Sequence, residues 1–222
     1  MQNVFTVTLP LLASVTTSMA TLPSVFPPPP VMNPPPVGKL LPFSIIQEEP
    51  TIKTATKEVA PEKPKEKRLV CKGCNANESQ ALEFFQNRGI VDKNALATIM
   101  GNIKQESTFV PNICEGGFRS SYSNCGGGYG LIQFTDAPRF YGLGRFAARI
   151  GGDPSTLDTQ LRYIMHENDW KMIENEMKTP GKSISDYMRL ARRWIRWGHH
   201  GSRTDFAYNY ANRFVLTEVE KS

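Results

Sequence analysis

The distribution of proline limits where this 222-residue chain can fold. Thirteen of its 17 prolines lie in residues 1–64, whereas 16 of its 17 glycines and 19 of its 22 aromatic residues lie in residues 71–222. The first 70 residues have no Trp or Tyr, so they bury too little apolar surface to offset the entropy of ordering a chain. The remaining residues suffice for one domain. We therefore expect an extended arm over 1–70 and one globular domain over 71–222.

The arm is predicted to be a tether. Residues 23–50 hold ten prolines, including the runs 27–30 and 34–36. Such sequence adopts polyproline II, which is extended and semi-rigid. Apolar patches such as Val31 with Met32, and Ile45 with Ile46, punctuate this tract. Isolated patches suit docking onto another protein better than packing on themselves.

Residues 1–20 have some features of a secretory signal. They contain a short apolar run and end in Ser18, Met19 and Ala20, which resembles a cleavage site. However, no Lys or Arg precedes Lys39, so the charged start of a signal is missing. An uncleaved strap that docks on a partner is the favoured interpretation. No stretch of the chain approaches the ~20 apolar residues of a membrane-spanning helix, so we expect no membrane span.

The net charge of the chain excludes few classes of function. The formal net charge is +5, and residues 71–222 carry 19 Lys and Arg against 16 Asp and Glu. An excess this small, spread over the whole domain, is no signal for binding a polyanion, and we expect no nucleic-acid partner. A mildly basic protein still approaches acidic polymers more readily than an acidic one does.

The four cysteines admit several arrangements. Cys71 and Cys74 have the spacing of one zinc knuckle, but Cys114 and Cys125 are too far apart to form a second. Two disulfides, or disulfides with free thiols, fit better, and three pairings are possible. A local bridge between Cys114 and Cys125 would staple a Gly-rich loop and place the protein outside a reducing cytoplasm. His199 and His200 are neighbours in the sequence and lack the i, i+4 spacing of a metal-binding pair, so we expect no metal and no cofactor.

Apolar periodicity predicts a mostly α domain of the α+β class. We expect helices that begin at Asn77 as N-cap, at Asp92, at Pro154, and at Ser183 or Ser185. A last helix carries the aromatic residues of 206–214. Residues 111–135 are Gly-rich and predict a loop with one small, irregular β element.

One carboxylate lies on an apolar helix face. Leu96, Ile99, Met100 and Ile103 form a core-facing stripe, and one further step of three residues reaches Glu106. Burial and the negative end of the helix dipole both raise the pKa of a carboxylic acid, and an acid that stays protonated can donate its proton to a leaving oxygen. The alternative is a frayed helix end with Glu106 in solvent.

The residues around Glu106 resemble a known family. The sequence GNIKQESTFVP over 101–111, then GYGLIQFT over 128–135, is similar to the lysozyme-like superfamily of goose-type lysozymes and lytic transglycosylases. The phage tail lysozyme type is the best match, and it also has a Glu-Gly pair, as at Glu115 and Gly116. The resemblance is dense over 94–139, diffuse to about residue 214, and absent from 1–70.

The resemblance implies cleavage of the β-1,4 bond between N-acetylmuramic acid and N-acetylglucosamine in peptidoglycan, with Glu106 as general acid. Glu115 lies nine residues later and Ser121 six beyond that, which resembles a phage lysozyme pattern with Asp and Thr in those places. In a hydrolase Glu115 would activate water. In a lytic transglycosylase one Glu suffices. Asp136 is a third candidate, with a turn role as its alternative.

The resemblance also implies substrate contacts. Ser107, Ser121 and Gln133 are candidates, because hydroxyl and amide groups hydrogen-bond sugars. Tyr129 and Trp197 could stack on or line the sugar path, with plain packing as the alternative for Tyr129. Trp194 is expected in the core, and the arginines at 139 and 145 at the surface or in contact with the wall.

The implied setting is a phage virion, in which the arm binds tail or baseplate proteins and the domain acts at the cell wall or periplasm. Two alternatives remain open here: a structural tail component with an inactive lysozyme-like domain, and a secreted bacterial lytic transglycosylase. An amidase or endopeptidase would need a zinc triad or a Cys-His pair, and neither is evident in the sequence.

Overall fold

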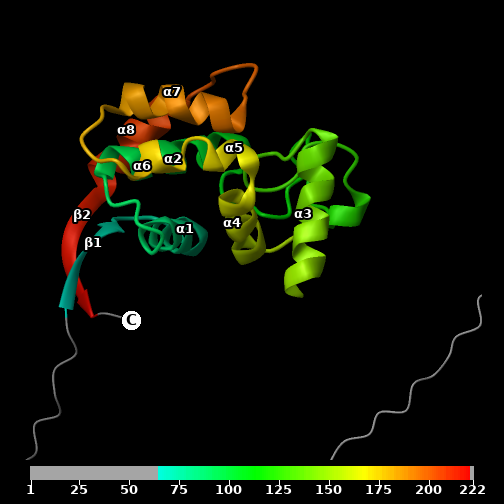
Figure 1. The fold of residues 1–222 in the computed structure, drawn as a ribbon, viewed down its shortest axis with the longest axis horizontal. Coiled ribbons are helices and arrows are strands. Elements are labelled where there is room, and N and C mark those ends of the chain that lie inside the picture. Colours follow the sequence, from blue (N-terminus) through cyan, green and yellow to red (C-terminus); the bar gives the residue numbers. More distant parts are fainter. Residues whose placement is uncertain (1–64, 221–222) are drawn as a thin grey trace, which may run out of the picture. The chain divides into compact units, whose positions relative to one another are not determined.

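Residues 65–220, which this computed structural model describes, form eight α-helices, one 3-10 turn and two strands (Figure 1). The α+β, mostly α class is confirmed. None of these helices has the length and apolar character needed to span a bilayer. The predictions for residues 1–64 lie outside the described residues. The elements are β1 (Lys65–Cys71), α1 (Ala76–Gln86), α2 (Lys93–Ser107), η1 (Tyr122–Asn124), α3 (Ala137–Ile150), α4 (Leu157–His166), α5 (Asn168–Lys171), α6 (Glu174–Lys178), α7 (Ile184–Ile195), α8 (Arg203–Arg213) and β2 (Phe214–Glu220).

Side-chain caps start several helices. The Asp92 carboxylate accepts hydrogen bonds from the backbone N–H groups of the first turn of α2, and Ser183, not Ser185, forms a capping box at the start of α7. The prediction for α1 was wrong by two residues. Its N-cap is Asn75, and the capping-box partner is Glu78. Asp136, the third candidate for a catalytic carboxylate, has a structural role instead: it is the N-cap of α3.

Helix α3 was missed by periodicity because it contains Gly142 and Gly144, which lower helix propensity. The structure explains both glycines. A Cβ at Gly142 would lie 2.1 Å from the Tyr163 hydroxyl, and one at Gly144 would lie 2.7 Å from the Tyr122 hydroxyl. Close packing against two tyrosines therefore excludes side chains from these positions.

The sheet joins the two ends of the described chain. Strands β1 and β2 are antiparallel, with Lys65 opposite Glu220 and Cys71 opposite Phe214. In the Gly-rich loop, where the β element was expected, the described residues have only the isolated bridges of Ile113 with Arg119 and of Cys114 with Tyr129. Strand β1 begins six residues before the expected domain boundary at residue 71, in charged sequence that gave no strand pattern.

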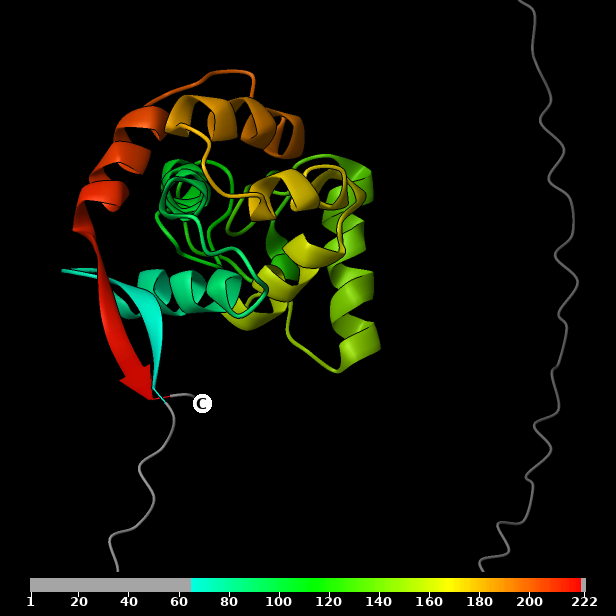
Figure 2. The same ribbon diagram turned by 60° about the vertical axis from the view of Figure 1, so that its left-hand side comes forward.

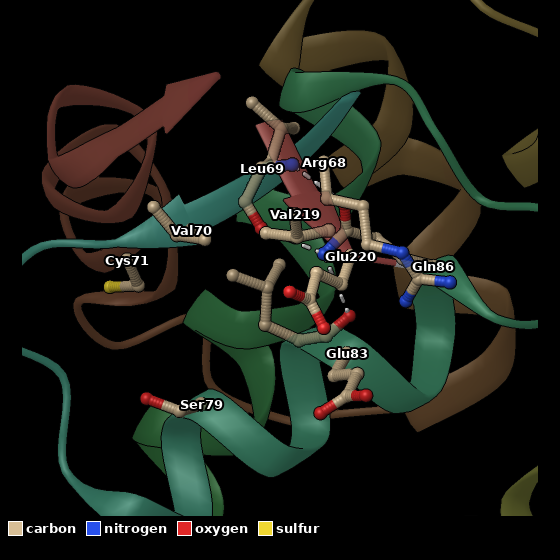
Figure 3. A pocket seen from close by; sticks show the side chains of 10 residues that line it. Arg68, Leu69, Val70, Cys71, Ser79, Glu83, Gln86, Val219 and Glu220 are labelled. Carbon is tan, nitrogen blue, oxygen red and sulfur yellow. Dashed lines mark hydrogen bonds between the residues drawn. The ribbon is translucent and has the colours of Figure 1, made fainter. Parts of the chain in front are cut away.

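A side chain covers the outer edge of β1. The Leu69 N–H donates to Gln86 Oε1 at 2.9 Å, and Gln86 Nε2 donates to the Leu69 carbonyl at 2.9 Å (Figure 3). The amide of Gln86 thus supplies both groups that a third strand would offer. Beside it, the sheet and α1 enclose a hollow of about 330 Å³ that contains none of the predicted site residues.

Helix α2 is the centre of the core. Ten of its residues are buried, and α1, α7 and α8 pack around it (Figure 2). Glu78 ties three of these helices together. Its carboxylate accepts hydrogen bonds from the Tyr210 hydroxyl of α8 at 2.6 Å and from the Lys104 ammonium of α2 at 3.2 Å. Burial by itself raises the pKa of Glu78, but these bonds and the Asn75 N–H outweigh it and lower the pKa.

The contact between α2 and α8 depends on Gly101. A Cβ at this position would lie 2.7 Å from the Ala207 nitrogen and 2.8 Å from the Arg203 carbonyl oxygen. Both atoms belong to the backbone of α8, which cannot yield as a flexible side chain can. The missing Cβ therefore sets the distance between the two helices.

Replacing Gly101 with Ala should lower the free energy of unfolding by about 2 kcal/mol, because the added methyl group overpacks a rigid backbone contact. Urea denaturation measures the change. Gly126→Ala is the matched control, since a Cβ there meets nothing within 4 Å. Equal stability of the two variants would contradict the close approach of α8.

Candidate active site

Glu106 lies in the last turn of α2 and is mostly buried. Its side chain is 14% exposed, so the alternative of a frayed, solvated helix end is excluded. The helix ends at the next residue, Ser107, and the C-cap Thr108 takes the left-handed conformation (φ 49°). The stripe of α2 therefore continues to its C-terminal end and places a carboxylate at the boundary between core and solvent.

Arg203 of α8 is the partner of Glu106. Its Nη2 donates to Glu106 Oε1 in an ion pair, and the arginine side chain is only 5% exposed. Nη1 donates to the carbonyl oxygens of His199 at 3.0 Å and His200 at 2.7 Å. The guanidinium carbon lies 4.9 Å from the Trp197 ring centroid, in cation–π contact. Arg203 is thus held on several sides.

Burial and the neighbouring positive charges shift the pKa of Glu106 in opposite directions. Burial raises the pKa of the Glu106 carboxyl, whereas the Arg203 charge, its hydrogen bond and the more distant Arg139 lower that pKa. Burial has the largest effect, and the pKa lies above its ordinary value. A raised pKa keeps part of the population protonated closer to neutral pH.

The loop before α8 is tied to the residue next to Glu106. The Ser202 N–H donates to Gln105 Oε1 at 2.8 Å, and Gly201 takes a positive φ of 57° against that side chain. Sequence reasoning missed Arg203, which is 97 residues from Glu106. One local signal existed. A cation in the first turn of a helix opposes the helix dipole and calls for a compensating anion.

Ser107 connects α2 to the GYGLIQFT segment. It is buried, and its hydroxyl donates to the carbonyls of Leu131 at 2.9 Å and Ile103 at 3.2 Å. Gln160 of α4 holds the same segment, since its Oε1 accepts from the Leu131 N–H at 2.8 Å. Gly130 has φ 73°, and a Cβ there would lie 2.2 Å from Gln160 Oε1. Glycine is therefore required at this position.

Glu115 is exposed and anchored to the same segment. Its Oε2 accepts from the Gly128 N–H at 3.0 Å, and its own N–H donates to the Gly128 carbonyl at 2.7 Å. The neighbouring Cys114 is bonded to Cys125, with 5.7 Å between their Cα atoms. The disulfide and the backbone bonds together hold the Glu115 loop against Gly128.

The other predicted substrate residues differ in accessibility. Gln133 is partly exposed, has φ 50°, and donates from Nε2 to the Gly130 carbonyl at 3.0 Å. Ser121 is exposed, and its hydroxyl lies 3.3 Å from that of Ser123. Trp197 is partly buried beside Arg203. Tyr129 is fully buried and bonds Ser155 Oγ at 2.7 Å, so its ring has the packing role and leaves no face open to a sugar.

Trp194 and Arg139 both lie in the interior of the domain. Trp194 is fully buried, as expected, but Arg139 is not the surface residue that the sequence predicted. It forms a buried bidentate ion pair with Glu167, at 2.6 and 2.9 Å.

All four cysteines are in disulfides, Cys71 with Cys74 and Cys114 with Cys125. Within residues 65–220, no group of three or more His, Cys, Asp and Glu side chains has the arrangement of a metal site.

Comparison with known proteins identifies the family. The model of the phage tail lysozyme family matches residues 76–213, which is more than half of the chain and spans α1 to α8. The chain belongs to the phage tail lysozyme family. It is also 31% identical over 108 residues to morphogenesis protein 1 of Bacillus phage B103. That match covers 49% of this chain and 27% of the relative, so the chain spans only about a quarter of the length of this relative.

Arg203→Met should destabilise the fold in a pH-dependent way. Without Arg203, the pKa of Glu106 in the folded state rises further above its unfolded value. Stability is then retained below the unfolded pKa and lost as the pH rises through the folded pKa. We expect a loss of about 3 kcal/mol near pH 8 and a smaller loss near pH 5, measured by urea denaturation.

The double variant Arg203→Met with Glu106→Gln is the control. Removing the unpaired charge should restore much of the stability lost near pH 8 and flatten the pH dependence. A loss that is equal at both pH values, and unchanged in the double variant, would contradict the coupling of these two residues.

Proposed function

We propose that this protein is a virion-associated glycosidase that cleaves the β-1,4 bond between N-acetylmuramic acid and N-acetylglucosamine, so that a phage tail can penetrate the cell wall. The observation that carries the proposal is the mostly buried Glu106 carboxyl, whose pKa is raised, at the end of the central helix of a phage tail lysozyme domain. A protonated carboxyl next to solvent is the group that glycoside cleavage needs.

Glu106 is proposed to donate its proton to the glycosidic oxygen as the bond to the leaving sugar breaks. The carboxylate that results stays beside the fixed Arg203 cation, which is already in place to stabilise it. By lowering the pKa of Glu106, Arg203 reduces the fraction of molecules that hold the proton before the reaction, but it also makes the protonated Glu106 a stronger acid.

Glu115 is proposed as the second carboxylate, which activates the attacking water. One of its oxygens is bound by the Gly128 N–H, and this bond orients the group. Gln133, Ser121 and Trp197 are the proposed substrate contacts, because each retains accessible surface. Ser107 is proposed to act indirectly, by fixing the segment that carries Gln133.

The proposed setting is the phage tail or baseplate. The family name supports a tail location, and the relative from a Bacillus phage supports a virion protein. Residues 1–70 are proposed to bind neighbouring tail or baseplate proteins through their apolar patches, and the glycan strand of peptidoglycan is the proposed substrate. The proposed place of action is the bacterial cell wall or periplasm.

Glu106→Gln should reduce wall lysis at least about 100-fold and leave the fold intact, because the amide oxygen can still accept from Arg203 but the amide N–H is not acidic enough to protonate the glycosidic oxygen. Turbidity clearing of purified peptidoglycan measures the activity. Glu83→Gln removes an exposed carboxylate on α1 and is the matched control. Full lysis by the Glu106 variant would refute the acid assignment.

The products of cleavage test Glu115. Hydrolysis yields reducing sugar ends, whereas transglycosylation yields 1,6-anhydro ends, and mass spectrometry of released fragments separates them. We expect reducing ends from the wild type and at least about 100-fold slower release by Glu115→Gln. Anhydro ends, released at an undiminished rate by this variant, would assign the reaction to a transglycosylase that works with Glu106 alone.

A structural role is the second candidate function, because the relative is named a morphogenesis protein. In that case the lysozyme-like domain would contribute to assembly and cleave nothing. Zymography of the full chain on gels that contain peptidoglycan decides between the two: clearing supports the glycosidase, and its absence for a folded protein supports the structural role.

A further inference from the structure

A basic hollow lies between α3 and α4, which pack side by side (Figure 1). It has a volume of about 430 Å³. Arg145 and Arg149 of α3 and His166 at the end of α4 line it. The remaining lining residues are Pro138, Gly142, Phe146, Tyr163, Glu167 and Asn168. Neither Glu106 nor Glu115 belongs to this hollow.

Two basic groups are in direct contact here. Arg149 Nη2 lies 2.9 Å from His166 Nε2, so the arginine donates to a neutral imidazole. Both groups lie on the same aromatic ring. The Arg149 guanidinium carbon is 5.3 Å from the Phe146 centroid, and the His166 ring is 5.2 Å from it. The Phe146 ring therefore holds a guanidinium and a neutral imidazole side by side.

The positive charge is not compensated within the described part of the chain. Among residues 65–220, neither Arg145 nor Arg149 forms an ion pair with an acidic side chain. The nearby acid, Glu167, is buried and gives both oxygens to Arg139. The two guanidinium groups of Arg145 and Arg149 therefore leave the hollow with an uncompensated positive charge, which attracts an anion.

We propose that this hollow binds an oxyanion, a phosphate or carboxylate group. Arg145 and Arg149 stand one helical turn apart on α3 and offer planar, multiple donors, which suit such anions. A protonated His166 adds a third donor. In the cell wall, the anion would be a group on an acidic polymer. This step rests on the proposed function, whereas binding of phosphate itself does not.

Binding should be linked to protonation of His166. Burial first, and then the charges of Arg149 and Lys171, lower the pKa of this imidazole. The other charged groups at the hollow are Arg145 and the Glu167–Arg139 pair. An anion seated among these cations opposes their effect and raises the His166 pKa. Acetate, whose own charge stays nearly constant over this range, should therefore bind more tightly at pH 6 than at pH 8.

The full chain has only three histidines, so proton NMR of the imidazole resonances provides a direct test. Inorganic phosphate, titrated against sodium chloride of equal ionic strength, should raise the pKa of His166 by about 0.5–1 unit and leave His199 and His200 unchanged. Acetate is the carboxylate arm: a comparable shift assigns the site to oxyanions in general, and a phosphate-only shift assigns it to phosphate.

Arg149→Gln should raise the phosphate concentration for half-saturation at least about tenfold. Arg162→Gln is the matched control, because Arg162 is an exposed arginine on α4 that pairs with Asp158. Phosphate and chloride with equal effects on His166, or equal binding by the two variants, would overturn the proposal. The measurement requires no glycan cleavage, so it stands or falls independently of the role of Glu106.

Discussion

The close contact between α2 and α8 at Gly101 determines the rest of the site. Because position 101 has no Cβ, the α8 backbone lies directly against α2, and the first residue of α8 is brought to the last turn of α2. This brings Arg203 onto Glu106, although the two residues are 97 positions apart in the sequence. The acid and its counterion are therefore products of one helix–helix distance, which also orders the core around α2.

A second set of contacts attaches the Gly-rich loops to this frame. Gln160 and Ser107 bind the backbone of the GYGLIQFT segment from two helices, and Glu115 binds the same segment from the opposite loop. Fixed hydrogen bonds replace regular secondary structure here, because glycines at 128 and 130 admit close side chains that any Cβ would displace. The segment that carries Gln133, one of the proposed substrate contacts, is thereby held without a sheet.

Sequence reasoning succeeded where the pattern was local. The stripe of α2 depends on contacts between residues three and four apart, so it predicted the helix. For Glu106 it left a buried position and a solvated helix end as alternatives, and the resemblance of the surrounding motif favoured the first. Sequence reasoning failed where a residue was selected by a distant partner. Gly142 and Gly144 obscure α3 because they accommodate Tyr163 and Tyr122. Likewise β1 shows no strand pattern, since its pairing with β2 joins opposite ends of the domain.

The sequence by itself determined the helical class, the split between a proline-rich arm and an aromatic-rich domain, and the motif that carries Glu106. Only the tertiary structure decided the partner of Glu106, the burial of Tyr129 and the ion pair of Arg139 with Glu167. The physical reason is the range of the forces involved. Periodicity records which face of a helix avoids water, but a counterion 97 residues away is chosen by helix packing, which no local pattern encodes.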